Sequence, residues 1–263
     1  MNPLSTLRRR ARQLHGPLRR WAAPLLPAHQ SLATVREYRH FLESWRAYSR
    51  LPGAEPLRFE DGYPCLFDRT PTTPYDPHYF HQAVWAAERI AAHQPEEHVD
   101  VGSEITFVGM LSVIVPVAFV DIRPFPVALA NLHPLAGDLL RGLPFADRSI
   151  PSLSCLHVAE HVGLGRYGDD LAVDGTKRAC AELQRILANK GRLYFSVPVG
   201  RPRVCFNAHR IHAPRQILGY FPELELEEFS LIGDDYRLVH DAAVDAAGDL
   251  DYGCGLFAFR RPR

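Results

Sequence analysis

The sequence has few cysteines and no closely spaced cysteine pair. Its five cysteines are scattered along the chain, and no two of them form a Cys-x-x-Cys motif. An odd number of widely separated cysteines suits neither a disulfide framework nor a zinc knuckle. We therefore expect reduced thiols and a cytoplasmic protein.

Excess charge and long apolar runs are also missing. The chain has 30 basic and 30 acidic residues, so no overall field attracts nucleic acid, and we expect none as a partner. The longest apolar run, 107–120, contains Pro116 and is too short to span a bilayer. With 46% apolar and 23% charged residues, the composition is that of an ordinary globular protein with a sizeable core.

Although the net charge of the chain is zero, its N-terminal segment is basic. Residues 1–36 contain seven arginines and no acidic residue. Pro24 and Pro27 interrupt the short apolar stretch within it, which argues against a signal peptide. A solvated tail is the plain interpretation of such a charge run. Leu and Trp residues among the arginines favour, as the alternative, peripheral contact with an anionic membrane, and a transit peptide is a third interpretation.

Apolar periodicity divides the chain into three regions. Helical spacing of apolar residues predicts an amphipathic helix over 32–48, so we assign 1–50 to a basic tail and this helix. Closely spaced prolines, followed by a second helical pattern from Phe80, make 51–95 a connector with a lead-in helix. Short apolar runs alternate with helical patterns over 96–263, which we assign to one α/β domain.

The C-terminal region has the pattern of a doubly wound α/β fold with a mostly parallel sheet. The predicted helices are 105–111, 179–187 and 214–221, and the tripeptide Asn189-Lys190-Gly191 is expected to stop the second of them. A polar loop is expected over 201–212, and the last two strands are expected to pair antiparallel at one sheet edge. The predicted strands are 98–101, 117–122, 132–136, 152–157, 192–198, 224–231 and 252–259.

The stretch 137–161 concentrates polar residues at two predicted strand ends. Asp138 follows the third strand, and His157, Glu160 and His161 follow the fourth. Because open α/β sheets bind ligands in the crevice at their strand ends, these groups point to one site. The run 157–161 also fits the His-x-x-Glu-His pattern of some zinc peptidases, which needs both histidines one helical turn apart. A metal-dependent hydrolase is therefore one hypothesis.

Several segments resemble class I S-adenosylmethionine-dependent methyltransferases, which have a Rossmann-like fold. They are VDVGS at 99–103, VDIRP at 120–124, GDLLRGLPFADRS at 137–149, SCLHVAEHV at 154–162 and ELQRILANKGRLYFSVP at 182–198. A closer resemblance is to an uncharacterised branch of that superfamily, the domain of unknown function 268. It lies in TPYDPHYF at 73–80, EHVGLGRYGDD at 160–170, FNAHRI at 206–211 and YGCGLFAF at 252–259.

The resemblance implies an enzyme with S-adenosyl-L-methionine as its cofactor. Asp100 and Gly102 would lie in the loop that holds the methionine part. Asp121 would accept hydrogen bonds from the ribose hydroxyls, and it lies 19 residues after Gly102, close to the spacing of roughly 20 residues expected for a ribose carboxylate. Asp138 would face the adenine amine.

The cofactor loop departs from the family pattern at two positions. Family loops usually read Asp-x-Gly-x-Gly-x-Gly, and Glu104 and Thr106 replace the second and third glycines. Glycine lets the backbone approach a ligand closely, so Glu104 would either bind the ammonium group of the cofactor or block the site. A non-catalytic binding protein with a methyltransferase-like fold is therefore the contrasting hypothesis.

Methylation of a hydroxyl group needs a base near the acceptor oxygen, and histidine suits that role at neutral pH. The candidates are His157, at the tip of the fourth strand, and His209, in the polar loop after the fifth. Kinship with proteins of surface-glycan biosynthesis implies a sugar or glycan acceptor, and we expect no metal ligands. The candidate contacts to sugar hydroxyls or to an acidic glycan are Arg166, Tyr167, Asp169 and Arg210.

Overall fold

A computed structural model describes residues 32–263 of the chain. Two compact units divide between Pro74 and Tyr75, whereas we expected boundaries after residues 50 and 95. The basic tail lies outside the described residues, so its contact with a membrane stays a prediction. No helix in the described part of the chain is long and apolar enough to cross a membrane.

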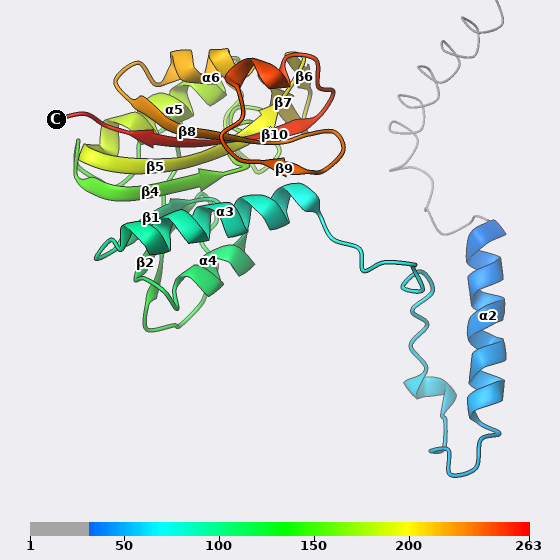
Figure 1. Cartoon of the computed structure of the whole chain (residues 1–263). Coiled ribbons are helices and arrows are strands. Elements are labelled where there is room, and N and C mark those ends of the chain that lie inside the picture. Colours follow the sequence, from blue (N-terminus) through cyan, green and yellow to red (C-terminus); the bar gives the residue numbers. More distant parts are fainter. Residues whose placement is uncertain (1–31) are drawn as a thin grey trace, which may run out of the picture. The chain divides into compact units, whose positions relative to one another are not determined.

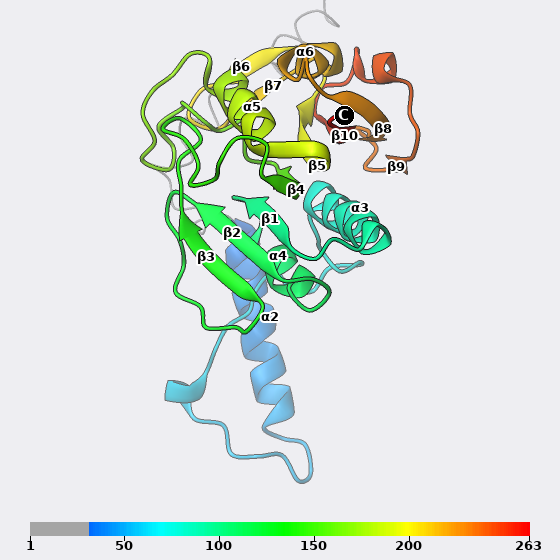
Figure 2. The same cartoon turned by 90° about the vertical axis from the view of Figure 1, so that its left-hand side faces the viewer.

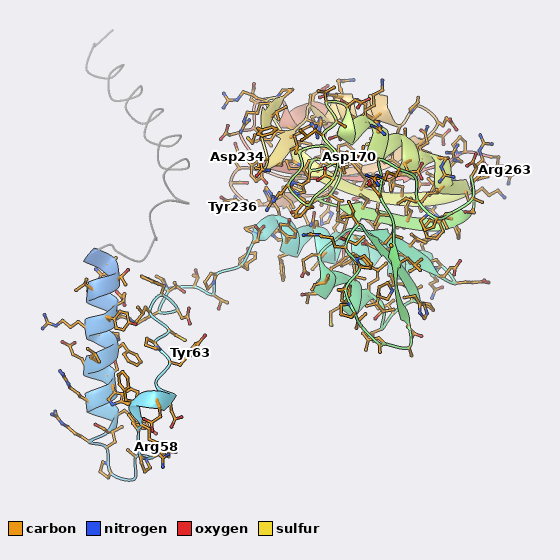
Figure 3. The ribbon with its side chains drawn as sticks, turned by 180° about the vertical axis from the view of Figure 1, so that it is seen from behind. Arg58, Tyr63, Asp170, Asp234, Tyr236 and Arg263 are labelled. Atoms are coloured by element: carbon orange, nitrogen blue, oxygen red, sulfur yellow. The ribbon has the colours of Figure 1, made fainter. Side chains whose placement is uncertain are left out.

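The first unit contains helix α2 (Leu32–Tyr48), which confirms the predicted helix, and the short 3-10 helix η1 (Phe59–Asp61). The segment after the helix returns alongside it, as Figure 3 shows for the stretch that carries Arg58 and Tyr63. Arg69 on this segment donates a hydrogen bond of 3.3 Å to Glu37 of the helix. This contact ties the returning segment to α2.

The second unit is built on an eight-stranded sheet with the order β3-β2-β1-β4-β5-β10-β8-β9 (Figures 1 and 2). Strands β1 to β5 are parallel, and β10 is antiparallel to both β5 and β8. The predicted doubly wound, mostly parallel sheet with an antiparallel edge is confirmed. The strands are β1 (His98–Val101), β2 (Val117–Asp121), β3 (Leu132–Ala136), β4 (Ile150–Leu156), β5 (Leu187–Val199), β8 (Glu225–Ile232), β9 (Leu238–Val239) and β10 (Gly253–Arg260).

Helices cover both faces of this sheet (Figure 1). Helices α3 (Pro77–His93) and α4 (Ile105–Leu111) pack on one face, where the core includes the fully buried Trp85. Helices α5 (Gly175–Ile186) and α6 (Pro214–Tyr220) pack on the other, around residues such as Leu183. Both faces of the central parallel strands β1 and β4 are therefore buried, which explains their nearly continuous apolar runs, whereas the edge strand β3 is partly exposed.

The helix α3 is fixed at both ends by specific contacts. The Asp76 side chain caps its first turn by accepting hydrogen bonds from the next backbone N–H groups, and Pro77 follows at a position that favours helix entry. Further along the helix, the Trp85 indole N–H donates to Glu228 of β8 at 3.0 Å, and Arg89 pairs with the same carboxylate at 2.6 Å. These contacts fix the second half of α3 against β8.

Two details after α5 differ from the sequence prediction. The helix passes directly into β5 at Leu187, and the predicted stop 189–191 lies inside that strand, where the pairing register with β4 shifts. The predicted polar loop contains a small hairpin, β6 (Arg203–Cys205) with β7 (His209–Ile211). Strands of this length are too short to show an alternating pattern in the sequence.

The antiparallel edge also has one more strand than expected. The last two predicted strands do pair, as β8 with β10. The short β9 adds to β8 and forms the outer edge. A turn that carries Asp234 and Tyr236 joins β8 to β9 (Figure 3).

Candidate active site

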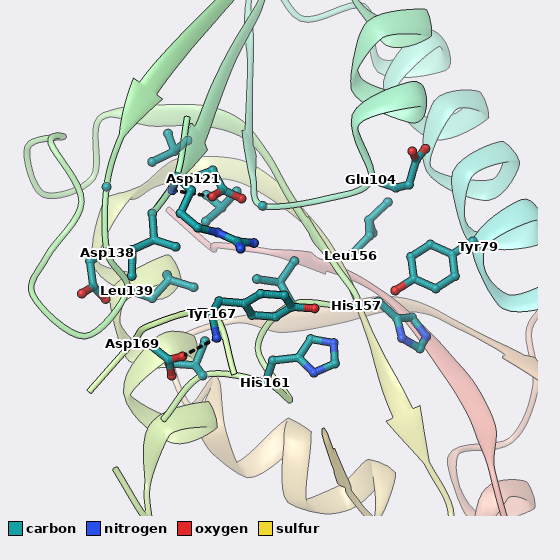
Figure 4. Close-up of a pocket in the computed structure, with 18 residues that line it drawn as sticks. Tyr79, Glu104, Asp121, Asp138, Leu139, Leu156, His157, His161, Tyr167 and Asp169 are labelled. Atoms are coloured by element: carbon teal, nitrogen blue, oxygen red, sulfur yellow. Dashed lines mark hydrogen bonds between the residues drawn. The ribbon is translucent and has the colours of Figure 1, made fainter. Parts of the chain in front are cut away.

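A cavity of about 260 Å³ opens at the carboxyl ends of β1 to β4 (Figure 4). Parallel sheets of this type bind ligands at this edge. Asp121 and Asp138 lie on one side of the cavity, and Tyr79 and His157 lie on the other. Residues from α3, from the strand ends and from the loop 157–174 therefore share one crevice.

The turn after β1 is shaped by Asp100 and Gly102. The fully buried Asp100 carboxylate accepts hydrogen bonds from the Ser103 backbone N–H at 3.0 Å and from the Ser103 hydroxyl at 2.7 Å, and Ser154 donates to it as well. Burial raises the pKa of Asp100 to about 6, against the effect of these hydrogen bonds. Asp100 therefore stabilises the turn from inside the protein and does not line the cavity, whereas Gly102, with a φ of 72°, does.

Glu104 caps α4 and leaves the cavity open. Its carboxylate accepts hydrogen bonds from the Phe107 backbone N–H at 3.0 Å and from the Thr106 hydroxyl at 2.8 Å. Figure 4 shows Glu104 at the cavity edge with its carboxylate turned toward the helix. The two residues that replace family glycines therefore build the first turn of α4.

The two carboxylates expected to hold adenosine line the same cavity. Asp121, at the end of β2, accepts a hydrogen bond from the Arg123 backbone N–H at 2.6 Å. Asp138, just after β3, accepts one from the Leu140 backbone N–H at 2.8 Å, and its other oxygen lies 3.5 Å from Arg141 Nε. Among residues 32–263, no hydrogen bond or ion pair engages the second oxygen of Asp121, whereas the second oxygen of Asp138 pairs with Arg141.

His157 lines the cavity, but both of its ring nitrogens are engaged. Nδ1 lies 2.9 Å from Glu160 Oε1, and Nε2 lies 3.1 Å from Cys254 Sγ. Burial disfavours the charged ring, yet the contacts with Cys254 and Glu160 outweigh it and raise the pKa of His157 well above its usual value. Because both ring nitrogens are already engaged, His157 has no free nitrogen to accept a proton from a substrate.

The structure places His209 and Arg210 outside the cavity lining. The His209 ring lies 5.0 Å from the Tyr252 ring, and burial lowers the pKa of His209. The buried Arg210 guanidinium donates to the Val162 carbonyl at 2.6 Å and to the Ala172 carbonyl at 2.8 Å. Both residues belong to β7, and Arg210 holds the loop 157–174 in place.

The other three predicted substrate residues lie near the cavity mouth. Tyr167 lines the cavity, and the guanidiniums of Arg123 and Arg166 lie 4.7 and 5.0 Å from its ring. Asp169 also lines it, but its carboxylate accepts hydrogen bonds from the Gly163 N–H at 2.6 Å and the Tyr167 N–H at 3.3 Å. Asp169 therefore organises the loop, whereas Tyr167 faces the cavity.

Sequence reasoning missed Tyr79 and Arg123 at this site, and it placed Glu160 and His161 there without giving them a role. The family segment TPYDPHYF already contains Tyr79, and the run 157–161 contains Glu160 and His161. That run forms turns instead of the helix that the zinc-peptidase geometry requires. Within 32–263, no group of three or more His, Cys, Asp or Glu side chains is arranged to hold a metal ion.

Comparison with known proteins agrees with this geometry. Residues 148–225 match the model of a family described as "Caenorhabditis protein of unknown function, DUF268", which confirms the resemblance over that segment. The N-methyltransferase NodS from Bradyrhizobium japonicum WM9, solved with S-adenosyl-L-homocysteine, aligns with a TM-score of 0.50 and 13% identity over 85% of this chain and 99% of NodS. The chain has the class I methyltransferase fold.

A second structural similarity shows that the fold alone does not determine the activity. The [4+2]-cyclase SpnF aligns with a TM-score of 0.50 and 14% identity over 69% of this chain and 81% of SpnF. No curated protein matches the chain. Because a methyltransferase fold also occurs in a protein described as a cyclase, the activity of this chain must be argued from its own site.

Proposed function

We propose that this protein is an S-adenosyl-L-methionine-dependent methyltransferase. The observation that supports the proposal best is the position of Asp121 and Asp138 at neighbouring strand ends of one cavity, where Asp121 keeps one oxygen free of protein contacts. Asp121 is suited to the ribose because a carboxylate can accept two hydrogen bonds from a diol. Asp138 is suited to the adenine amine, and the turn at Gly102 to the methionine part. The bound cofactor would supply a methyl group on a positively charged sulfur.

The residues that depart from the family loop are compatible with this cofactor. Glu104 is held at the first turn of α4 by Thr106 and the Phe107 backbone, so it does not occupy the space next to Gly102. The cavity, about 260 Å³, lies just below the usual range for ligand sites of about 300–1,000 Å³. The position of Glu104 therefore supports cofactor binding over a blocked, degenerate loop.

We also propose that the acceptor is a hydroxyl group of a sugar or surface-glycan intermediate. Arg123 and Arg166 flank the Tyr167 ring near the mouth of the cavity. In the described part of the chain, neither guanidinium forms a salt bridge with a carboxylate. Two guanidiniums around an aromatic face suit an acidic group on such an acceptor, because guanidinium binds carboxylate and phosphate through paired hydrogen bonds.

Calorimetric titration with S-adenosyl-L-homocysteine tests the cofactor. We expect saturable binding to one site. Absence of both heat and a thermal shift at roughly millimolar ligand, where even an affinity of about −4 kcal/mol is detected, would favour the non-catalytic alternative. A screen of nucleotide sugars with a radiolabelled methyl donor then tests the acceptor. Neutral hydrocarbon alcohols are included in the same screen, and label in these alcohols without any labelled sugar would contradict the glycan assignment.

A further inference from the structure

We infer that His161 accepts the proton of the acceptor hydroxyl and that Glu160 is a positioning residue that stabilises the protonated His161 ring. The inference rests on the proposed methyl transfer and names the base for it. Neither residue belongs to the pair of histidines that the sequence indicated. The argument depends on which ring nitrogens in this part of the site are already engaged.

His161 is the histidine that presents an unoccupied nitrogen at the cavity. It lines the cavity, and its ring lies 5.6 Å from the Tyr167 ring at an angle of 85° (Figure 4). Nδ1 is hydrogen-bonded to the Ala208 carbonyl. A carbonyl oxygen only accepts, so Nδ1 carries the hydrogen and the lone pair of the neutral ring lies on Nε2. Within 32–263, no hydrogen bond reaches this Nε2.

Glu160 is a buried carboxylate whose contacts are with two histidine rings. Its side chain is 0% exposed, His157 Nδ1 contacts Oε1, and no hydrogen bond from the described residues reaches Oε2. Buried polar groups are normally satisfied, because an unpaired one costs free energy. Oε1 lies 2.9 Å from His157 Nδ1 and 3.6 Å from His161 Nε2. A proton on that Nε2 would therefore give the carboxylate a second cationic neighbour.

The charges around His161 support the same assignment. Burial would raise the pKa of Glu160, but the neighbouring His157 ring outweighs burial and lowers it, so Glu160 is ionised at neutral pH. The other titratable or charged groups that face His161 are His209, whose ring lies 6.5 Å away, Tyr167, and Arg166, which donates to the Ala208 carbonyl. Of all these groups, Glu160 is the one carboxylate within 4 Å of the ring.

The proposed step balances without a further reactant. A lone pair of the acceptor oxygen forms the bond to the methyl carbon, and the carbon–sulfur bond breaks with its electron pair staying on sulfur. The hydroxyl proton moves to His161 Nε2. The products are a methyl ether, a neutral thioether and an imidazolium next to Glu160, and the imidazolium then returns its proton to water.

Nitrogen NMR of the ¹⁵N-histidine-labelled protein, with and without S-adenosyl-L-homocysteine, tests the assignment without turnover. We expect the neutral His161 ring to carry its hydrogen on Nδ1, and His157 to keep its charge to higher pH than a free imidazole. In Glu160→Gln we expect His157 to lose its charge at lower pH, while Glu96→Gln, an exposed control, leaves it unchanged. A neutral His161 ring with its hydrogen on Nε2 would overturn the proposal.

Turnover with an acceptor from the nucleotide-sugar screen provides the second test. We expect His161→Gln to lower kcat by roughly 10²–10⁴-fold, the usual contribution of a general base, with unchanged affinity for S-adenosyl-L-homocysteine. His133→Gln, at an exposed position on β3, is the matched control and should keep full activity. Glu160→Gln should lower kcat and move the acid limb of the pH–rate profile to lower pH.

The two proposals fail in different ways. If S-adenosyl-L-homocysteine does not bind to the wild type, the proposed function fails, while the nitrogen shifts still decide whether His161 has a free Nε2. If the ligand binds but His209→Gln abolishes turnover and His161→Gln does not, the methyltransferase stands and His161 is not its base. A Glu160→Gln variant with an unchanged pH–rate profile would remove the positioning role.

Discussion

Replacing Gly102 by alanine should destabilise the second unit, because two unfavourable effects coincide there. Gly102 has a φ of 72°, and a left-handed conformation costs a non-glycine residue about 1–2 kcal/mol. The added Cβ would lie 3.0 Å from Val158 Cγ1 and 3.3 Å from Cγ2, and such crowding costs about 1–3 kcal/mol. A sum of about 3 kcal/mol lowers the Tm of a unit of this size by roughly 6–12 °C.

Two other glycines separate these contributions. Gly168 has a φ of 89° but open space around an added Cβ, so Gly168→Ala should show only the backbone effect, about 1–2 kcal/mol. Gly109 lies in α4 with open space around an added Cβ, so Gly109→Ala should stabilise the protein by up to about 1 kcal/mol.

Urea and thermal unfolding, followed by near-UV circular dichroism, measure all three variants. Adding Val158→Ala to Gly102→Ala should recover the part of the loss that comes from crowding, as a double-mutant cycle would show. If Gly102→Ala is no less stable than Gly168→Ala, the turn after β1 does not lie against Val158. If it is as stable as the wild type, the left-handed turn itself is wrong.

Three further predictions concern the cap of α4, an acid-sensitive contact and the cysteines. Glu104→Ala should lose about 0.5–2 kcal/mol of stability, because the cap of α4 is removed. Its calorimetric affinity for S-adenosyl-L-homocysteine should be unchanged. A large gain in affinity would show that Glu104 blocks the site. Burial opposes ionisation of Glu228, but Arg89 outweighs it and lowers the pKa of Glu228 from 4.5 to about 2. The pair therefore stabilises the fold above about pH 4.5 and loses this effect as the pH falls toward 2. The difference in urea midpoint between wild type and Glu228→Gln should shrink from pH 7 to pH 3. A difference that stays constant over this range would contradict the prediction. Iodoacetamide should label the exposed Cys65 of the native protein and leave the buried Cys180 unmodified. Peptide mass spectrometry measures the two labelling levels. Equal labelling would contradict the burial of Cys180.

The sequence was sufficient to predict most of the fold, because the central strands form short apolar runs buried on both faces and the helices are amphipathic. Strand β3 was predicted at its observed bounds, 132–136. The hairpin β6–β7 was not predictable in this way, since each strand has three residues. The early start of β5 was missed because Asn189 to Gly191 look like a helix stop but form an irregular part of the strand.

The sequence likewise predicted some residues of the candidate site and could not predict others. Asp121 and Asp138 were expected to be close because they lie at the ends of consecutive strands. The order of strands along the sequence is enough to predict this when the strands are parallel neighbours. The difference between His157 and His161 could not be read from the sequence. It depends on Cys254 and the Ala208 carbonyl, which lie 97 and 47 residues away along the chain. Arg210 looked like a substrate residue for the same reason, since nothing in its neighbourhood reveals the carbonyls that it binds.

Calorimetric titration of S-adenosyl-L-homocysteine into the wild type and Asp121→Ala tests the central claim most directly. Loss of one hydrogen bond to a charged group costs about 1.5–3 kcal/mol, which corresponds to a rise in Kd of roughly 10- to 150-fold. Asp249→Ala, at an exposed position outside the cavity lining, is the matched control and should bind like the wild type. Binding to the wild type that weakens by this factor in Asp121→Ala agrees with the account. Equal affinity in all three proteins, or no binding to the wild type, would contradict it.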